Sequence, residues 1–312
     1  MPTVPRPSPT TLRRLTLATL VANVGIVVTG GAVRLTGSGL GCPTWPRCTD
    51  DSYVPSRALA GHGLIEFGNR TLTSVLVAVT LATLAATLLA VPRRLPLVRL
   101  AVVAFLGIPA QIVLGGVTVL TDLNPWVVML HFLLSAALIA VSLVLWQRAR
   151  EPSDAPASSP VVRRELVLAG RLVVALAGAT LVLGAVVTGS GPHAGDAAAP
   201  RTGLDPGLVS QVHADVVMLL IGLSIGVWVG LRASRAPAAA VRAAGLLVAV
   251  EAAQGLVGFT QYFTKLPALL VGLHMLGACL VWVGAIRMLL ATRARAATAV
   301  LSPDDHRVSV AS

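Results

Sequence analysis

Eight long apolar stretches, separated by short polar segments, set the hydrophobic pattern of this chain. A helix needs about 20 mostly apolar residues to cross a bilayer. Lipid offers the backbone no hydrogen-bond partner, so such a segment must satisfy its own N–H and C=O groups as a helix. The pattern therefore predicts an all-α polytopic membrane protein with eight transmembrane helices. The predicted spans are Leu15–Val33, Thr71–Val91, Leu100–Leu120, Trp126–Trp146, Leu172–Thr188, Leu208–Leu231, Ala243–Thr260 and Pro267–Leu290.

Composition supports this class of protein. Of the 312 residues, 55% are apolar and only 12% are charged, whereas soluble domains have about 25% charged residues. A water-facing surface cannot be built from so few charges, which excludes a soluble enzyme, a disordered chain and a coiled coil. The first apolar stretch follows Arg13 and Arg14. It is longer than the about 7–15 residues of a signal-peptide core, so we expect an uncleaved anchor.

The cations alternate between the two ends of the predicted helices. With the N-terminus inside, 18 of the 24 Lys and Arg residues fall on the cytoplasmic side and 6 on the other. Lys and Arg are retained on the cytoplasmic side of membrane proteins. We therefore expect a multi-pass protein of a bacterial plasma membrane with both termini in the cytoplasm. The net charge of +11 then reflects topology, and no nucleic-acid partner is expected because the cations form no single stripe.

A polar segment, Glu151–Pro160, divides the eight spans into two sets of four. We interpret it as part of a cytoplasmic linker, because it is rich in Pro and Ser. The predicted organisation is an N-terminal four-helix half (1–150), a linker (151–165), a C-terminal four-helix half (166–295) and a cytoplasmic tail (296–312).

The two halves share sequence features. A Gln-x-x-x-Gly pair is followed by a histidine in each half, and the Gln-to-His separation is 20 residues in both: Gln111, Gly115 and His131, then Gln254, Gly258 and His274. An even number of spans in each half makes the repeats parallel, related by an axis along the membrane normal. We expect two similar four-helix bundles side by side, each with room for a ligand between its helices.

Three histidines, His131, His213 and His274, lie in or at the edge of predicted spans. An ionisable residue in a span indicates a functional site, although a single histidine can simply bond a neighbouring carbonyl. His213 and His274 lie at similar depth on different spans, and two neutral imidazoles facing each other make an axial pair for haem iron. A zinc site would need four ligands, and Asp215 points to another helix face.

The repeat predicts a partner for His131 near position 70, where the chain has Asn69. His62 lies two helical turns earlier and shares a face with Glu66 and Asn69 if the helix reaches that far. The first half therefore has either one iron ligand with an open face or a second ligand from His62. A haem iron with one open face is typical of sites that catalyse reactions. A haem iron with two axial ligands is typical of electron-transfer sites.

Two cysteines, Cys42 and Cys48, lie in the loop between the first two spans, on the side of the membrane where disulfides persist. A structural disulfide is expected there, and a redox role is a further alternative. Cys279 has no partner in its span and is expected to be a small core residue.

These residues together resemble the heme A synthase family. The resemblance covers nearly the whole chain and is carried by the run Thr36-Gly37-Ser38-Gly39-Leu40-Gly41-Cys42-Pro43-Thr44-Trp45-Pro46-Arg47-Cys48, by Ile65-Glu66-Phe67, and by His131, His213 and His274. It implies an oxidoreductase that converts the C8 methyl of heme O to the formyl group of heme A by successive hydroxylations. Heme O synthase and a terminal oxidase are the implied partners.

The resemblance also implies roles for individual residues. His213 and His274 would bind haem b, and His131 would bind the iron of the substrate haem. Glu66 would be the required carboxylate, and Cys42 and Cys48 would form the loop disulfide. The family pattern has a histidine where this chain has Asn69, which leaves the ligation of the first haem open.

The residue chemistry is compatible with these roles and with simpler ones. Glu66 can transfer a proton beside a haem edge or pair with Arg70 four residues later. Arg34 and Arg70 can bind haem propionates or reach from the span ends into the interface. Two other functions stay open: a haem-b electron-transfer cytochrome without substrate chemistry, and a membrane transporter.

Overall fold

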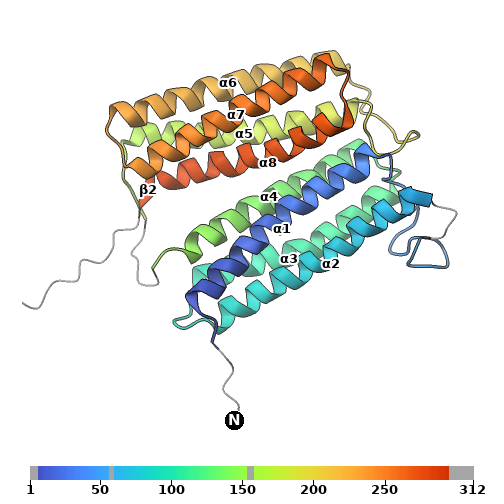
Figure 1. Cartoon of the computed structure of the whole chain (residues 1–312), viewed down its shortest axis with the longest axis horizontal. Helices are drawn as coiled ribbons and strands as arrows, with labels where there is room; N and C mark the ends of the chain where they lie inside the picture. The colour runs from blue at the N-terminus through green and yellow to red at the C-terminus, as the bar shows by residue number, and fades with distance from the viewer. Residues whose placement is uncertain (1–5, 56–59, 153–157, 295–312) are drawn as a thin grey trace, which may run out of the picture.

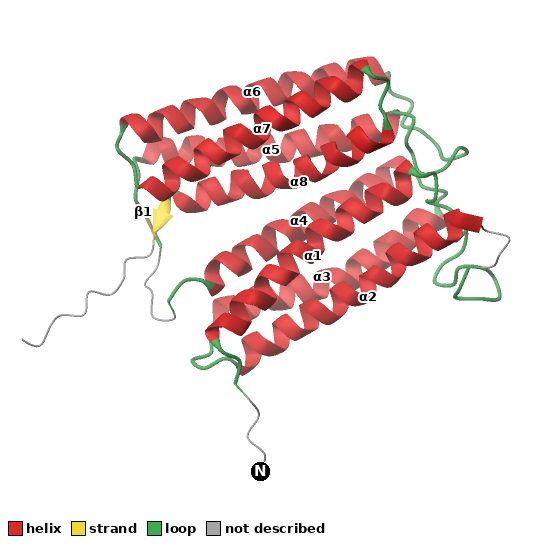
Figure 2. Cartoon of the chain, viewed as in Figure 1, coloured by secondary structure: helices red, strands yellow, loops and turns green. Residues whose placement is uncertain are grey.

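The computed structural model describes residues 6–55, 60–152 and 158–294, and this part of the chain is almost entirely helical (Figures 1 and 2). The segments outside this part are 1–5, 56–59, 153–157 and 295–312. They include part of the predicted linker and the whole predicted tail. Within the described residues there are eight helices: α1 Pro9–Leu35, α2 Ala60–Leu89, α3 Leu95–Leu120, α4 Pro125–Ala149, α5 Arg164–Ser190, α6 Pro206–Ala233, α7 Ala238–Phe263 and α8 Ala268–Ala291.

All eight of these helices are long and apolar enough to span a bilayer, which confirms the predicted all-α polytopic membrane protein. Two short strands, β1 Ser159–Pro160 and β2 Arg293–Ala294, pair antiparallel. The start of α1 and the end of α8 lie at the same end of the molecule (Figure 1).

Most of the helices extend beyond the predicted spans into polar residues, and polar side chains cap some of these ends. Ser8 caps α1 by accepting a hydrogen bond from the Thr11 amide, and Asp205 caps α6 by accepting one from Leu208. The largest difference is in α2, which begins at Ala60 rather than at Thr71. The hydropathy pattern missed this extension because Glu66, Asn69 and Arg70 interrupt the apolar run. They lie in the helix because their side chains bond neighbouring elements.

Contacts between helices define two groups of four. In the first group, α1 packs on α2, α2 on α3, α3 on α4 and α4 on α1; in the second, α5 to α8 close a ring in the same order. The two groups lie side by side (Figure 1). In these rings α2 and α4 occupy opposite corners, and so do α6 and α8. A parallel internal repeat between the groups stays a prediction.

The two groups meet through α1 and α4 on one side and α5 and α8 on the other. A buried apolar cluster at this junction joins Leu20, Val27, Ile139 and Leu143 to Cys279. Cys279 is buried and free, as expected for a core residue. Trp282 of α8 donates its indole N–H to the Ala136 carbonyl of α4 at 2.9 Å. The junction is therefore packed like a protein core.

Loops from both groups meet at the end of the molecule that carries the α1–α2 loop (36–59) and the α5–α6 loop (191–205), which we call the loop end. The Gly39 amide donates to the Gly195 carbonyl at 2.8 Å. A Cβ at Gly39 would lie 3.1 Å from that carbonyl oxygen, and Gly195 has a φ of +103°. Both glycines are therefore needed for this close approach between the groups.

Candidate functional site

A large cavity of about 1690 Å³ is lined by residues of both helix groups. Ordinary small-molecule sites have about 300–1,000 Å³, so this cavity has room for more than one ligand of that size. Most of its lining side chains are apolar. The candidate residues Arg34, Glu66, Asn69, Arg70, His131, His213 and His274 all line it. The fold therefore brings the whole predicted set to one connected space.

Each of the three histidine rings packs against a glycine of the preceding helix. The ring Cε1 lies 3.1 to 3.2 Å from the position that a Cβ on that glycine would take. The pairs are His131 with Gly115, His213 with Gly184, and His274 with Gly258. A larger residue at any of these glycines would press on the ring, so the glycines leave room for the Cε1 edge of each ring beside the neighbouring helix.

The repeated glutamines hold the helix turns that carry two of these histidines. The Gln254 amide donates to the His274 carbonyl at 2.7 Å. The Gln111 amide donates to the His131 carbonyl at 3.2 Å and to the Ser135 hydroxyl at 2.6 Å. The matching spacing in the sequence thus corresponds to matching contacts in the two groups. The sequence analysis used these glutamines as markers of the repeat, and the structure adds their contact with the histidine-bearing helices.

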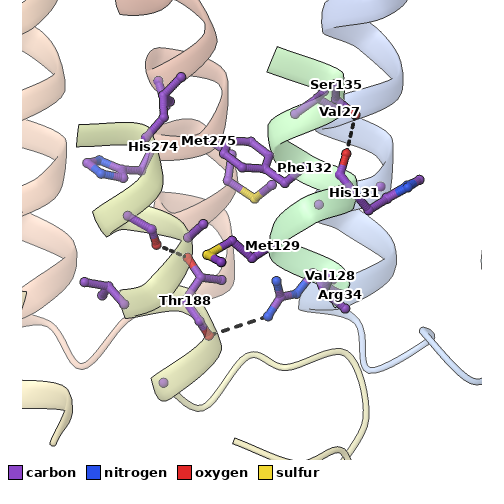
Figure 3. A pocket seen from close by; sticks show the side chains of 18 of the residues that line it. Val27, Arg34, Val128, Met129, His131, Phe132, Ser135, Thr188, His274 and Met275 are labelled. Atoms are coloured by element: carbon purple, nitrogen blue, oxygen red, sulfur yellow. Dashed lines mark hydrogen bonds between the residues drawn. The ribbon is translucent and has the colours of Figure 1, made fainter. Parts of the chain in front are cut away.

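The histidine rings have unused hydrogen-bonding capacity. In the described part of the chain, the Nδ1 atoms of His131, His213 and His274 are buried and have no hydrogen-bond partner. Buried polar groups without a partner are rare and call for an explanation. The rings of His131 and His274 point away from each other into different parts of the cavity, with Met129, Phe132 and Met275 between the two helices (Figure 3). Each helix group thus has its own histidine-bearing site.

The two sites differ at one corner. In the second group, His213 on α6 and His274 on α8 occupy opposite corners of the ring of helices. In the first group, the corner opposite His131 of α4 belongs to α2, where Asn69 lines the cavity. The side-chain oxygen of Asn69, Oδ1, accepts a hydrogen bond from the Thr29 hydroxyl of α1 at 2.8 Å.

His62 lies in α2, as its alternative role required, but it faces the loop rather than the cavity. Its Nδ1 is 2.9 Å from the Ser38 hydroxyl, and it is absent from the residues that line the cavity. A Cβ on Gly41 would collide with the His62 carbonyl, so the loop backbone packs directly on this turn. The structure therefore assigns His62 to the attachment of the loop.

Glu66 is a buried carboxylate at the edge of the cavity, with 6% of its surface exposed. One oxygen accepts the Cys42 backbone N–H at 2.7 Å, and the other accepts two N–H groups of Arg70 at 2.6 and 3.0 Å. The expected ion pair with Arg70 is therefore formed, on a carboxylate that also lines the cavity. The pairing with Arg70 is therefore observed, and the proton-transfer role of Glu66 stays a prediction.

The loop that follows α1 is closed by the disulfide between Cys42 and Cys48, which confirms the predicted pair. Arg70 donates to the carbonyls of Cys42, Thr44 and Arg47 at 3.0 to 3.2 Å. The Trp45 ring lies directly on Gly116 of α3. The disulfide loop is thus fixed to α2 and α3 and holds Glu66 in place.

Two arginines lie at the loop end of the cavity. Arg34 donates to the His193 carbonyl at 2.8 Å and reaches the Thr188 carbonyl at 3.5 Å (Figure 3). Its Nε is buried without a hydrogen-bond partner among the described residues. Arg201, which sequence reasoning missed, donates to the carbonyls of Gly191, Pro192 and Ala199. Both arginines place positive charge beside the cavity, which favours an anionic ligand group there.

A second buried carboxylate, Glu251 of α7, lines the cavity in the second group. Its Oε1 accepts the Ser224 hydroxyl at 2.9 Å, while its Oε2 is buried without a partner in the described residues. The sequence analysis gave Glu251 no role, and the Ser224 contact between α6 and α7 had no signal in the sequence.

Comparison with known proteins places this chain in a family. Residues 13–201, more than half of the chain, match the family model COX15-CtaA, described as cytochrome oxidase assembly protein. This match begins within α1, includes α2 to α5, the disulfide loop and His131, and ends before His213 and His274.

Individual relatives point the same way. The chain is similar to proteins named heme A synthase from Geobacillus kaustophilus (29% identity over 132 residues, 42% of this chain and 40% of the relative) and Geobacillus thermodenitrificans (28% over 136 residues, 43% and 41%). A third, from Exiguobacterium sibiricum, is 30% identical over 128 residues, 39% of this chain and 42% of the relative. The chain thus spans about two fifths of the length of the curated relatives it matches. By the family match, this multi-pass membrane protein belongs to the COX15-CtaA family, the heme A synthase family that its loop motif and histidines resemble.

Proposed function

We propose that the chain is a heme A synthase, an oxidoreductase that converts the C8 methyl of heme O to the formyl group of heme A by successive hydroxylations. Heme O is the substrate in the first helix group, and haem b is the cofactor in the second. The observation that carries this proposal is the pair of histidine-bearing sites, one in each group, that open on one large apolar cavity.

The residues of the second group fit a haem. Two imidazoles at opposite corners have buried Nδ1 atoms without partners among the described residues, and a glycine leaves room for the edge of each ring. His213 and His274 would hold haem b, which would supply one-electron transfer. Arg201, which lines the same cavity, suits the anionic edge of a porphyrin in this group.

In the first group, His131 would bind the iron of heme O, and Asn69 would lie on the other side of the same space. Glu66 would hold or move a proton at the edge of the substrate, with its position set by Cys42 and Arg70. Arg70 lines the cavity too, and we assign it with Arg34 to the propionate side of the substrate. Cys42 and Cys48 support Glu66 through the loop that they close.

The wider setting follows from the same proposal. The protein would lie in the plasma membrane of a bacterium with both termini in the cytoplasm and the loop end outside. It would take heme O from a heme O synthase and deliver heme A to a terminal oxidase. The halves 1–150 and 166–295 would carry the substrate site and the haem b site, joined by the linker 151–165 and followed by the tail 296–312.

The deciding experiment is extraction and chromatography of the haems bound to the purified full-length chain, made in cells that also produce heme O. We expect b-type haem together with heme O or heme A. Haem b alone would favour an electron-transfer cytochrome without substrate chemistry. A protein free of haem would contradict the proposal and favour a transporter.

Variants of the second site test its assignment. His213→Ala and His274→Ala should each lose the low-spin b-type spectrum, because one axial ligand is removed. His193→Ala is the matched control, since the His193 ring bonds the Leu266 carbonyl at 2.9 Å in the loop region and should leave that spectrum unchanged. Retention of the low-spin haem in both His213→Ala and His274→Ala would refute the second-site assignment.

A further inference from the structure

We propose that the first site binds its haem iron through His131 alone, and that Asn69 presents an amide N–H to the opposite face. The ferrous site would therefore take a small neutral diatomic ligand such as carbon monoxide. This inference rests on the proposed function, because it requires a haem in the first group. It goes further by stating the coordination of that haem and the ligand class it accepts.

The first step is the geometry of the corner. His131 on α4 and Asn69 on α2 occupy opposite corners of their ring of helices, as His274 and His213 do in the second group. A porphyrin held by His131 between these helices would therefore present its other face to α2. The side chain that α2 offers at this place is an amide, which is a poor iron ligand beside imidazole.

The second step is the state of that amide. The Thr29 hydroxyl lies 2.8 Å from the Asn69 Oδ1 and 3.2 Å from the Ile26 carbonyl. Because Oδ1 accepts this hydroxyl and Asn69 lines the cavity, Nδ2 is the end of the amide that is left to donate there. Thr29 thus sets which end of the amide faces the space above the porphyrin.

The third step is the search for another iron ligand. His62 bonds Ser38 and lies outside the cavity lining. Glu66 is held by Cys42 and Arg70 through both oxygens. The sulfur atoms of Met129 and Met275 lie between α4 and α8, on the side away from the His131 ring (Figure 3). Among the described residues that line the cavity, His131 is left as the iron ligand of the first group.

The fourth step is room for a small ligand. An asparagine is smaller than a histidine, and on the adjacent helix Gly30 lines the cavity with no atom within 4 Å of its Cβ position. The second site has a different environment, because Gly184 packs on the His213 ring itself. Carbon monoxide would bind ferrous iron through its carbon lone pair, and its oxygen would accept a hydrogen bond from the Asn69 amide.

The experiment uses the purified full-length chain carrying both haems. Dithionite supplies one electron to each ferric iron, carbon monoxide is added, and difference absorption and infrared spectra are recorded. We expect one of the two haems to bind carbon monoxide while the bis-histidine haem does not. His131→Ala should remove the reactive haem and leave the low-spin b-type spectrum in place.

Variants at the opposite corner test the role of Asn69. Asn69→His should abolish carbon monoxide binding and add a second low-spin signal. Asn69→Ala should keep the binding but shift the C–O stretch to higher frequency, because the N–H donor is lost. Thr29→Val should shift it in the same direction, since the amide is no longer held.

The failures are distinct. If both haems are present and neither binds carbon monoxide, the first iron has two strong ligands and the inference is wrong while the proposed function stands. If the reactive haem persists in His131→Ala, the ligand assignment is overturned. If Asn69→Ala leaves the C–O stretch unchanged, the amide does not face the ligand. A chain that contains b-type haem alone overturns the inference and the proposed function together.

Discussion

Glu66 has both carboxylate oxygens engaged, by a backbone N–H of the disulfide loop and by Arg70. A carboxylate in a membrane-spanning helix is costly unless it is paired and hydrogen-bonded. Here the partners come from a loop that packs over the end of α2. The loop therefore stabilises a charged residue at the edge of an apolar cavity and fixes its position there.

Replacing Glu66 by glutamine tests its proposed role without removing its bulk. The amide of Glu66→Gln can still accept the Cys42 N–H but cannot take up a proton at neutral pH. Since general acid–base groups contribute about 10²–10⁴ in rate, heme A formation should fall by about that factor. The heme A to heme O ratio in extracts of the cells is the measurement, with haem b content expected to stay normal.

The matched control is Asp215→Asn, which neutralises an exposed carboxylate of α6 that bonds Gln211. This variant should keep the full ratio of heme A to heme O. An unchanged ratio in Glu66→Gln would remove Glu66 from the reaction and reduce it to an anchor for the loop.

At the scale of the element, the three glycine–histidine pairs show how closely neighbouring helices pack around the candidate ligand residues. Gly115, Gly184 and Gly258 each lie under a histidine ring of the next helix. A valine at such a position would need space that the ring occupies, and overpacking costs about 1–3 kcal/mol. We expect the imidazole to rotate to make room for the valine, because its ring atoms lie nearest to the new side chain.

Two valine variants should therefore act locally. Gly258→Val should perturb the spectrum of the bis-histidine haem and leave the substrate haem unchanged, while Gly115→Val should do the reverse. Optical and electron paramagnetic resonance spectra of the purified variants report each site separately. Gly222→Val on α6 is the control, since no atom lies within 4 Å of its Cβ position. Equal effects of both variants on both haems would contradict two separate sites.

The positions of the helices could be predicted from the sequence better than the contacts between their side chains. Hydropathy located every span because about 20 apolar residues carry that signal on their own. The start of α2 was missed because its polar residues are satisfied by the loop, a tertiary effect. The pairing of Gly184 with His213 was missed as well. One reason is that α5 has Thr180 at the position where α3 and α7 have a glutamine. The other is that the long α5–α6 loop changes the number of residues between the glycine and the histidine.

Several partners of the candidate residues had no sequence signal at all. The bond from the Cys42 amide to Glu66 involves a backbone group that every loop residue has, so only the folded loop identifies it. The same is true of Thr29 on Asn69 and of the carbonyls that bind Arg34. Residue types indicated the chemistry, and three-dimensional packing decided which atoms meet.

For the whole molecule, the central feature is that two ligand sites share one rigid body. The groups are joined at the α1, α4, α5 and α8 junction and again at the loop end. Arg34 links them directly, because it belongs to α1 and bonds carbonyls of the second group. Such an arrangement holds the two histidine-bearing sites at a fixed separation, as the proposed function with two haems would need.

Replacing Arg34 by methionine tests this coupling. Arg34→Met removes a buried charge-assisted hydrogen bond to the His193 carbonyl, and such bonds contribute about 1.5–3 kcal/mol each. We expect a lower melting temperature of the haem-loaded protein in detergent, with both haems released in the same transition. Arg93→Met is the control, since Arg93 is exposed and bonds the Leu88 carbonyl just before it in the chain. If Arg34→Met instead released one haem well before the other, the two groups would be melting independently, and the rigid junction would have to be carried by Trp282 and the apolar cluster around Cys279 alone.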